Sequence, residues 1–199
     1  MHPAILILAA GSATRMRGGD KLLERVQGQP LLRRQAEMAL RLTPLVIVTH
    51  RSQDPDRLAA LQGLRLHLQP VPDAASGMSA SLRAGATRAM QLRATALMIL
   101  PADMPDLTGE DLARLIAAFD QSRSFIHRAA SSGGTPGHPV MIPENLIPEL
   151  AELTGDEGAR AMLGRHRDRI TLHPLPGTHA LTDLDTPEEW AAWRELRGE

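Results

Sequence analysis

Cysteine and tyrosine are absent from this chain of 199 residues, and lysine occurs once. Without cysteine there are no disulfides, no thiolate nucleophile and no cysteine-ligated zinc or iron–sulfur site. Aromatic residues make up 2% of the chain, too few to form stacking platforms for single-stranded nucleic acid. The net charge of −1 gives no basic excess either, so we expect no nucleic-acid partner.

Long hydrophobic runs are also absent. The apolar run that ends at Ala10 is far shorter than the roughly 20 residues that cross a membrane. It follows no basic segment, unlike the core of a signal peptide. We therefore expect a cytoplasmic protein with no membrane association. The length of 199 residues favours one domain over residues 1–199, because domains average about 150 residues.

Short apolar runs alternate with helical patterns along the chain. The runs that predict strands cover residues 4–8, 45–49, 64–68, 96–100, 124–130, 139–142 and 169–172. Helices are predicted to begin near residues 30, 54, 78, 108, 156 and 186. Continuous apolar strands that alternate with helices indicate an α/β fold, with a mostly parallel sheet covered by helices on both faces. Ligands of such sheets bind beyond the carboxyl ends of the strands.

The loop after the first strand, residues 10–21, carries the clearest signal. Its small residues let backbone N–H groups approach a ligand closely. Arg15 offers a fork for phosphate oxygens, and Lys21 is the one lysine beside 21 arginines. An ammonium is compact, whereas a guanidinium is planar and larger. We therefore expect Lys21 to lie where a guanidinium does not fit. The loop is neither a Walker A loop nor a dinucleotide fingerprint, and the alternative is a glycine-rich turn with solvated charges.

The loop after the third predicted strand ends in a helix start. Gly77 precedes a helix whose first turn carries Ser79 and Ser81. Free N–H groups and hydroxyls there suit an anion or the edge of a nucleotide base. Ordinary capping by serine is the alternative.

Two aspartates are candidates for magnesium. Asp103 follows a buried strand and lies between two prolines, and Asp185 precedes the last helix. Mg²⁺ in proteins takes one or two carboxylates together with substrate phosphates. The alternatives are a turn aspartate at 103 and a carboxylate that favours the helix dipole at 185.

Three further residues are candidates for contact with a second substrate. His138 follows a turn-rich loop, while Asp156 and Arg160 lie one turn apart at a predicted helix start. Strand capping and helix capping are the structural alternatives.

Six motifs occur in order: L-A-A-G-x₃-R-M followed by lysine, G-M-S-x-S-L, P-A-D-M-P, G-H-P-V, G-D-E-G-A-R and D-x-D-T-P-E. Together they resemble the molybdenum cofactor cytidylyltransferases and, more distantly, the molybdopterin guanylyltransferases. The resemblance implies one Rossmann-like, GT-A-like nucleotidyltransferase domain. It also implies Mg²⁺-dependent transfer of CMP from CTP to the terminal phosphate of molybdopterin, with release of pyrophosphate. The product would pass transiently to a molybdoenzyme or its chaperone.

The resemblance assigns roles to the residues above. It implies a catalytic set of Arg15, Lys21 and Asp103, and a metal held by Asp103 and Asp185. The implied nucleotide-binding residues are Leu8, Ala9, Ala10, Gly11, Arg15, Lys21, Gly77, Ser79, Ser81 and Asp103. The implied acceptor-binding residues are His138, Asp156 and Arg160.

Three sequence features depart from a uniform family pattern. Residues 9–11 (AAG) resemble the cytidylyl branch, whereas residues 18–21 (GGDK) resemble the guanylyl branch. The loop before Gly137 and His138 lacks the arginine expected there. GMP transfer from GTP therefore stays open, as does transfer to a sugar or alcohol phosphate. A cofactor-binding chaperone is the non-enzymatic alternative, and a nicotinamide oxidoreductase lacks its G-x-G-x-x-G signature.

Overall fold

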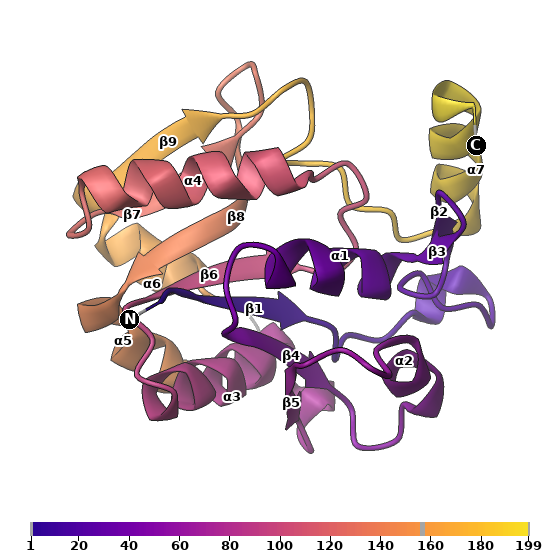
Figure 1. Cartoon of the computed structure of the whole chain (residues 1–199), viewed down its shortest axis with the longest axis horizontal. Coiled ribbons are helices and arrows are strands. Elements are labelled where there is room, and N and C mark those ends of the chain that lie inside the picture. Colours follow the sequence, from indigo (N-terminus) through magenta and orange to yellow (C-terminus); the bar gives the residue numbers. More distant parts are fainter. Residues whose placement is uncertain (1, 156–157, 199) are drawn as a thin grey trace.

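A computed structural model of the protein describes residues 2–155 and 158–198. Its centre is a seven-stranded sheet in the order β5-β4-β1-β6-β8-β7-β9 (Figure 1). The strands are β1 (Ala4–Leu8), β4 (Val46–His50), β5 (His67–Pro70), β6 (Ala96–Pro101), β7 (Ile126–Ala130), β8 (Pro136–Pro143) and β9 (Ile170–Pro174). A separate hairpin joins β2 (Arg25–Val26) to β3 (Gln29–Pro30).

Helices cover both faces of the sheet. They are α1 (Leu31–Leu40), α2 (Pro55–Ala60), α3 (Met78–Gln91), α4 (Gly109–Gln121), α5 (Ile147–Ala151), α6 (Arg160–Arg165) and α7 (Pro187–Arg197). In Figure 1, α1 and α4 lie on one face, and α3, α5 and α6 lie on the other. This architecture confirms the predicted α/β fold with a mostly parallel sheet.

The alternation of side chains along β1 explains the two layers. Ile5 and Ile7 pack in the core under α1 and α4, whereas Ala4 and Leu6 pack in the core under α3. Successive residues of a strand point to opposite faces, so a continuous apolar run fits a strand buried on both sides. Gly85 of α3 lies so close to Leu6 that a Cβ there would collide with the leucine.

One central strand runs against the others. β8 pairs antiparallel with both β6 and β7, while the other neighbouring strands of the sheet pair in parallel. The first residues of β8 therefore lie at the edge where the parallel strands end. Sequence patterning predicted the strand without its direction, because a short apolar run carries no directional information.

Two local predictions need correction, and one element was missed. The strand predicted over 64–68 is β5, displaced toward the carboxyl end, because Gly63 at φ +84° turns the chain and Leu64 and Leu66 pack into the core instead. The β2–β3 hairpin was not predicted, since each of its strands has two residues. The helix predicted from Asp156 begins at Arg160, and Asp156 itself lies outside the described residues.

The last helix, α7, packs beside the hairpin rather than on the sheet (Figure 1). Trp190 and Trp193 form a small core with Met16, Val26 and Leu31. A capping box at Thr186 starts the helix as the sequence predicts,. None of the helices in the described ranges has the length and hydropathy of a membrane span.

Candidate active site

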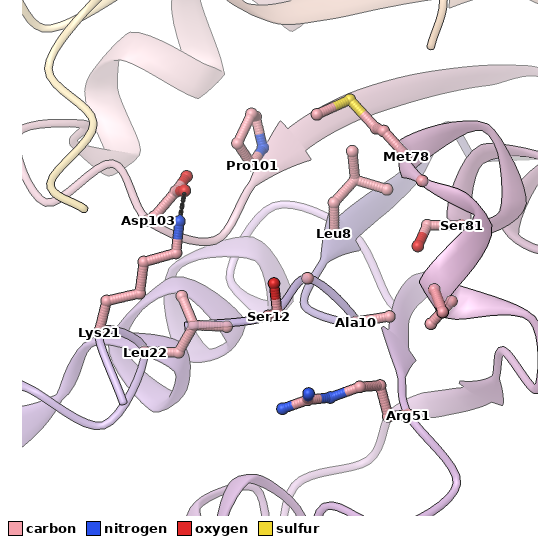
Figure 2. A pocket seen from close by; sticks show the side chains of 14 residues that line it. Leu8, Ala10, Ser12, Lys21, Leu22, Arg51, Met78, Ser81, Pro101 and Asp103 are labelled. Atoms are coloured by element: carbon pink, nitrogen blue, oxygen red, sulfur yellow. Dashed lines mark hydrogen bonds and ion pairs between the residues drawn. The ribbon is translucent and has the colours of Figure 1, made fainter. Parts of the chain in front are cut away.

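A cavity of about 550 Å³ opens at the carboxyl edge of the parallel strands. It is formed by the loops that follow β1, β4, β5 and β6, together with the start of α3. Its lining residues are Leu8, Ala10, Gly11, Ser12, Lys21, Leu22, Arg51, Ala74, Ala75, Gly77, Met78, Ser81, Pro101 and Asp103. In Figure 2, Lys21 and Asp103 lie at one end and Met78 and Ser81 at the other. The three predicted loops therefore meet at one site.

Lys21 lies between two carboxylates. Its Nζ donates to Oδ2 of Asp103 at 2.5 Å and to Oδ1 of Asp185 at 2.5 Å. The lysine side chain is only 12% exposed, so water screens these charges poorly. The structure thus joins three of the predicted residues, although they are up to 164 positions apart in the sequence.

The charge state of Lys21 follows from this arrangement. Burial acts to lower the pKa of Lys21, but the carboxylates of Asp103 and Asp185 outweigh it and raise the pKa above its usual value. The neighbouring Asp183 carboxyl has a raised pKa, first because of burial and then because of the Asp103 charge. The site therefore holds a permanent ammonium among closely spaced acidic groups.

Hydrogen bonds fix the turn that carries Asp103. The amide of buried Gln35 on α1 donates to the carbonyl of Met104 at 2.6 Å. The N–H of Leu184 donates to the carbonyl of Asp103 at 3.3 Å, which ties this turn to the segment that holds Asp185. The two carboxylates are therefore held by the backbone as well as by Lys21.

The carboxylates of Asp103 and Asp185 fit a divalent ion shared with a substrate. Both converge on one point, which the ammonium of Lys21 fills. Mg²⁺ needs one or two carboxylates when phosphates supply further ligands. Within residues 2–155 and 158–198, no group of three or more acidic, histidine or cysteine side chains could hold a metal by itself. The arrangement suits an ion that arrives with a phosphate-bearing ligand.

Three predicted nucleotide-binding residues lie outside the cavity lining. Arg15 is 67% exposed and pairs with Oδ2 of Asp185 at 2.6 Å, so it reaches the site through that carboxylate. Ala9 is buried beneath the loop. Ser79 is buried, and its hydroxyl has no hydrogen-bond partner among the residues that the structure describes, whereas Ser81 lines the cavity. Helical residues two apart point to different sides, so both serines cannot face one ligand.

A second cavity of about 440 Å³ adjoins the first, and Met78 lines both. It contains two of the predicted acceptor residues, His138 and Arg160. Arg128 of β7 lines it too, and its Nε donates to the carbonyl of Gly137 at 2.9 Å. An arginine on the adjacent strand β7, rather than one in the loop before His138, therefore contacts this part of β8.

His138 is neutral at physiological pH. Burial, followed by the charge of Arg128, lowers its pKa from 6.5 to about 4, while the charge of Asp103 acts in the opposite direction. Its Nδ1 is buried without a partner in the described part of the chain. A protonated imidazole there would be costly, because it would lie next to a guanidinium.

Acid is therefore expected to destabilise the protein through His138. The unfolded chain takes up a proton near pH 6.5 that the folded chain does not take up until about pH 4. The contribution of neutral His138 to the free energy of unfolding is then fully present above pH 6.5, and it is lost as the pH falls from 6.5 to about 4,. Between pH 7 and 4.5 the free energy of unfolding should drop by up to about 2 kcal/mol more in wild type than in His138→Gln.

Urea unfolding at several pH values measures this difference. His2→Gln is the control, because His2 is exposed near the amino terminus. A His138→Gln protein that loses as much stability in acid as wild type would contradict the assignment.

Sequence reasoning missed three arginines at the site: Arg51, Arg57 and Arg128. Arg51 lines the first cavity directly after β4, where its position past a buried strand was a usable signal. Arg57 is completely buried beneath the first loop. Arg57 and Arg128 gave no such signal, because each lies inside a regular element and only tertiary packing brings it to the site.

Comparison with known proteins classifies the chain. The MobA-like NTP transferase domain matches residues 5–170, which include the first loop, Lys21, Asp103 and His138. The chain belongs to this family. Asp185 lies beyond the matched region, yet it completes the carboxylate pair around Lys21. Family membership makes the protein a nucleotidyltransferase, as the motifs predicted.

Curated relatives extend over nearly the whole chain. A molybdenum cofactor guanylyltransferase of Bradyrhizobium sp. is 37% identical over 200 residues, covering 96% of this chain and 91% of the relative. The purine catabolism protein PucB of Bacillus subtilis is 30% identical over 196 residues, covering 93% and 92%.

Solved structures share the fold of this MobA-like domain. Rv0371c of Mycobacterium tuberculosis superposes with a TM-score of 0.80 at 25% identity, covering 98% of this chain and 99% of that one. A manganese complex of Rv0371c superposes with a TM-score of 0.76 at 24% identity, covering 98% and 99%.

Proposed function

We propose that this protein transfers GMP from GTP to the terminal phosphate of molybdopterin and releases pyrophosphate. The observation that carries the proposal is the Lys21 ammonium between Asp103 and Asp185 at the end of a cavity of about 550 Å³. A cation and two carboxylates beside a backbone loop are suited to a nucleoside triphosphate with a divalent ion. Relatives named molybdenum cofactor guanylyltransferase support the donor and the acceptor.

The donor nucleotide would occupy the first cavity. Its polyphosphate would lie against the N–H groups of residues 10–13, close to Lys21 and Arg15. Asp103 and Asp185 would hold Mg²⁺, which would neutralise charge on the phosphates at the reacting centre. The manganese complex of Rv0371c is consistent with a divalent ion in this fold.

The acceptor would occupy the second cavity. Arg128 and Arg160 line it and are suited to bind an anionic substrate, while neutral His138 would be a hydrogen-bonding group rather than a charge. An oxygen of the acceptor phosphate would attack the α-phosphorus of the donor, and the bond to the β-phosphate would break. No general base is required, because a phosphate monoester is already ionised at neutral pH.

GTP replaces CTP as the favoured donor. Residues 9–11 (AAG) favoured CTP in the sequence, but the relatives that match nearly the whole chain include guanylyltransferases. Arg51 adds a physical argument, since it lines the cavity and its side chain is drawn in Figure 2 on the opposite side from Pro101. A guanidinium matches O6 and N7 of guanine, so Arg51 is compatible with a guanine donor, while cytosine offers its own adjacent acceptors, O2 and N3.

CTP is the second candidate donor, and a specific observation favours it. Ala10, the middle residue of the AAG stretch that resembles the cytidylyl branch, lines the cavity. Gly77 and Ser81 of the G-M-S-x-S-L motif line it too. Base choice therefore depends on the balance between Ala10 and Arg51 at one site.

Pyrophosphate release with Mg²⁺ and molybdenum-loaded molybdopterin tests the proposal, with GTP, CTP, ATP and UTP run in parallel. We expect kcat/KM with GTP to exceed kcat/KM with each of the other three nucleotides by about 100-fold or more. A site that hydrogen-bonds the polar groups of one base discriminates to at least this degree against bases that lack them.

Activity with CTP alone would overturn the donor assignment and leave the reaction type standing. Binding of a triphosphate without pyrophosphate release would overturn the acceptor. The same assay with other phosphorylated acceptors would then be informative, because PucB is named for purine catabolism.

A further inference from the structure

Arg57 is a charged residue with no exposed surface. It lies in α2 and is 0% exposed, which is rare for arginine unless every donor is engaged. Its Nη1 donates to the carbonyl of Ala9 at 2.6 Å and to the carbonyl of Gly11 at 2.9 Å. Its Nε and Nη2 donate to the two carboxylate oxygens of Asp20 at 2.6 and 2.9 Å. One buried guanidinium therefore binds four acceptors of the first loop.

These contacts join the two ends of the loop. Ala9 and Gly11 flank the start of the loop after β1, and Asp20 lies at its end, immediately before Lys21. The chain between them contains left-handed residues at Arg17 and Gly18 and projects toward solvent. Ordering each residue of such a loop costs conformational entropy, and the contacts of Arg57 offset part of that cost at the base of the loop.

The carbonyl contacts also set the direction of the peptide groups. In a planar trans peptide the C=O and N–H bonds point in opposite directions. The carbonyls of Ala9 and Gly11 point at Arg57, so the N–H groups of Ala10 and Ser12 point away from it. Both residues line the cavity, and neither N–H donates to another group in the described part of the protein. Two unpaired donors are thereby presented on the cavity side.

We propose that Arg57 is the positioning residue that holds this loop in the shape that receives the polyphosphate of the nucleotide. It acts from beneath the loop by orienting the N–H groups of Ala10 and Ser12, and through Asp20 it fixes the backbone next to Lys21. The inference rests on the proposed function, because it takes a nucleoside triphosphate as the ligand of the loop.

The chain offers a matched control in Arg33 of α1. Its Nη1 donates to the carbonyls of Ala60 and Gln62, each at 3.0 Å, and its Nε pairs with Glu37 at 2.9 Å. Arg33 thus also binds two carbonyls and one carboxylate, and it also holds α2. It does so at the far end of that helix, away from the first loop.

The experiment compares Arg57→Gln with Arg33→Gln by calorimetric titration of GTP and of GMP, both with Mg²⁺. We expect Arg57→Gln to raise the Kd of GTP by about 30-fold, the effect of losing oriented charge-assisted contacts. The Kd of GMP should rise less than about 3-fold, because GMP lacks the β- and γ-phosphates. Arg33→Gln should change neither Kd by more than about 2-fold.

Asp20→Asn is the second variant, in case Arg57→Gln does not fold. Asparagine keeps the shape of the side chain and weakens only the contact between Arg57 and residue 20. The Kd of GTP should therefore rise by about 5-fold, and the Kd of GMP should stay unchanged.

If Arg57→Gln weakens the binding of GTP and of GMP equally, the inference is overturned and Arg57 has a general structural role. The same outcome in Asp20→Asn decides the question if only that variant folds. Unchanged GTP binding in a folded Arg57→Gln protein would overturn it too, while leaving the proposed function intact. Failure of wild type to bind any nucleoside triphosphate would overturn both.

Discussion

Replacing Asp103 with asparagine is expected to lower kcat of pyrophosphate release by about 100-fold or more, the loss that follows removal of one group that stabilises transition-state charge. Asparagine keeps the shape of the side chain but removes the negative charge that Lys21 binds at 2.5 Å. A neutral amide also binds Mg²⁺ more weakly than a carboxylate does. The variant should therefore need a higher Mg²⁺ concentration for half-maximal activity.

Initial rates at several Mg²⁺ concentrations measure both effects. Asp106→Asn is the control, because Asp106 lies in the same turn but binds Trp193 and Arg197 instead of the cavity residues. We expect the Asp106 variant to lose stability and keep its Mg²⁺ dependence. An Asp103→Asn enzyme with wild-type kcat and an unchanged Mg²⁺ requirement would disprove the metal assignment.

Lys21→Arg should reduce kcat by at least about tenfold, equivalent to roughly 1.4 kcal/mol in the barrier. The charge is kept, but the side chain is only 12% exposed and binds two carboxylates at once. A planar guanidinium is larger than an ammonium and directs its donors in a fixed fork. It would push apart Asp103 and Asp185, the residues whose convergence defines the site.

The reverse substitution at an exposed position provides the control for Lys21. Arg17→Lys exchanges the same two residue types where the side chain is 73% exposed and pairs with Glu188. Exposed ion pairs contribute little, so kcat should stay within about twofold of wild type. Steady-state kinetics of both variants and of wild type give the comparison. Wild-type turnover in Lys21→Arg would mean that the single lysine has no catalytic significance.

The sequence predicted the chemistry of the site better than its geometry. Lys21, Asp103 and Asp185 were selected because residue type and position after a strand or before a helix are local signals. Asp103 and Asp185 were expected to share a metal, but the contact of Lys21 with both carboxylates was not predicted. Ser79 was selected with Ser81 by residue type, but the helical rotation turns it into the core.

Arg57 and Arg128 show most clearly what could not be predicted from the sequence. Each looks like an ordinary arginine of a short helix or strand in the sequence. No local pattern marks Arg57 as a residue that binds carbonyls 48 and 46 positions away. The direction of β8, which brings His138 to the carboxyl edge, was equally hidden.

The sequence by itself therefore determined the α/β class, the strands and helices at its core, the family motifs and most of the charged residues of the site. These follow from periodicity and from local chemistry, which act over a few neighbouring residues. Tertiary structure alone decided that Lys21 joins Asp103 to Asp185, that Arg57 lies beneath the first loop and that Arg128 lies beside His138. Those contacts depend on the order and direction of the strands, which long-range packing selects.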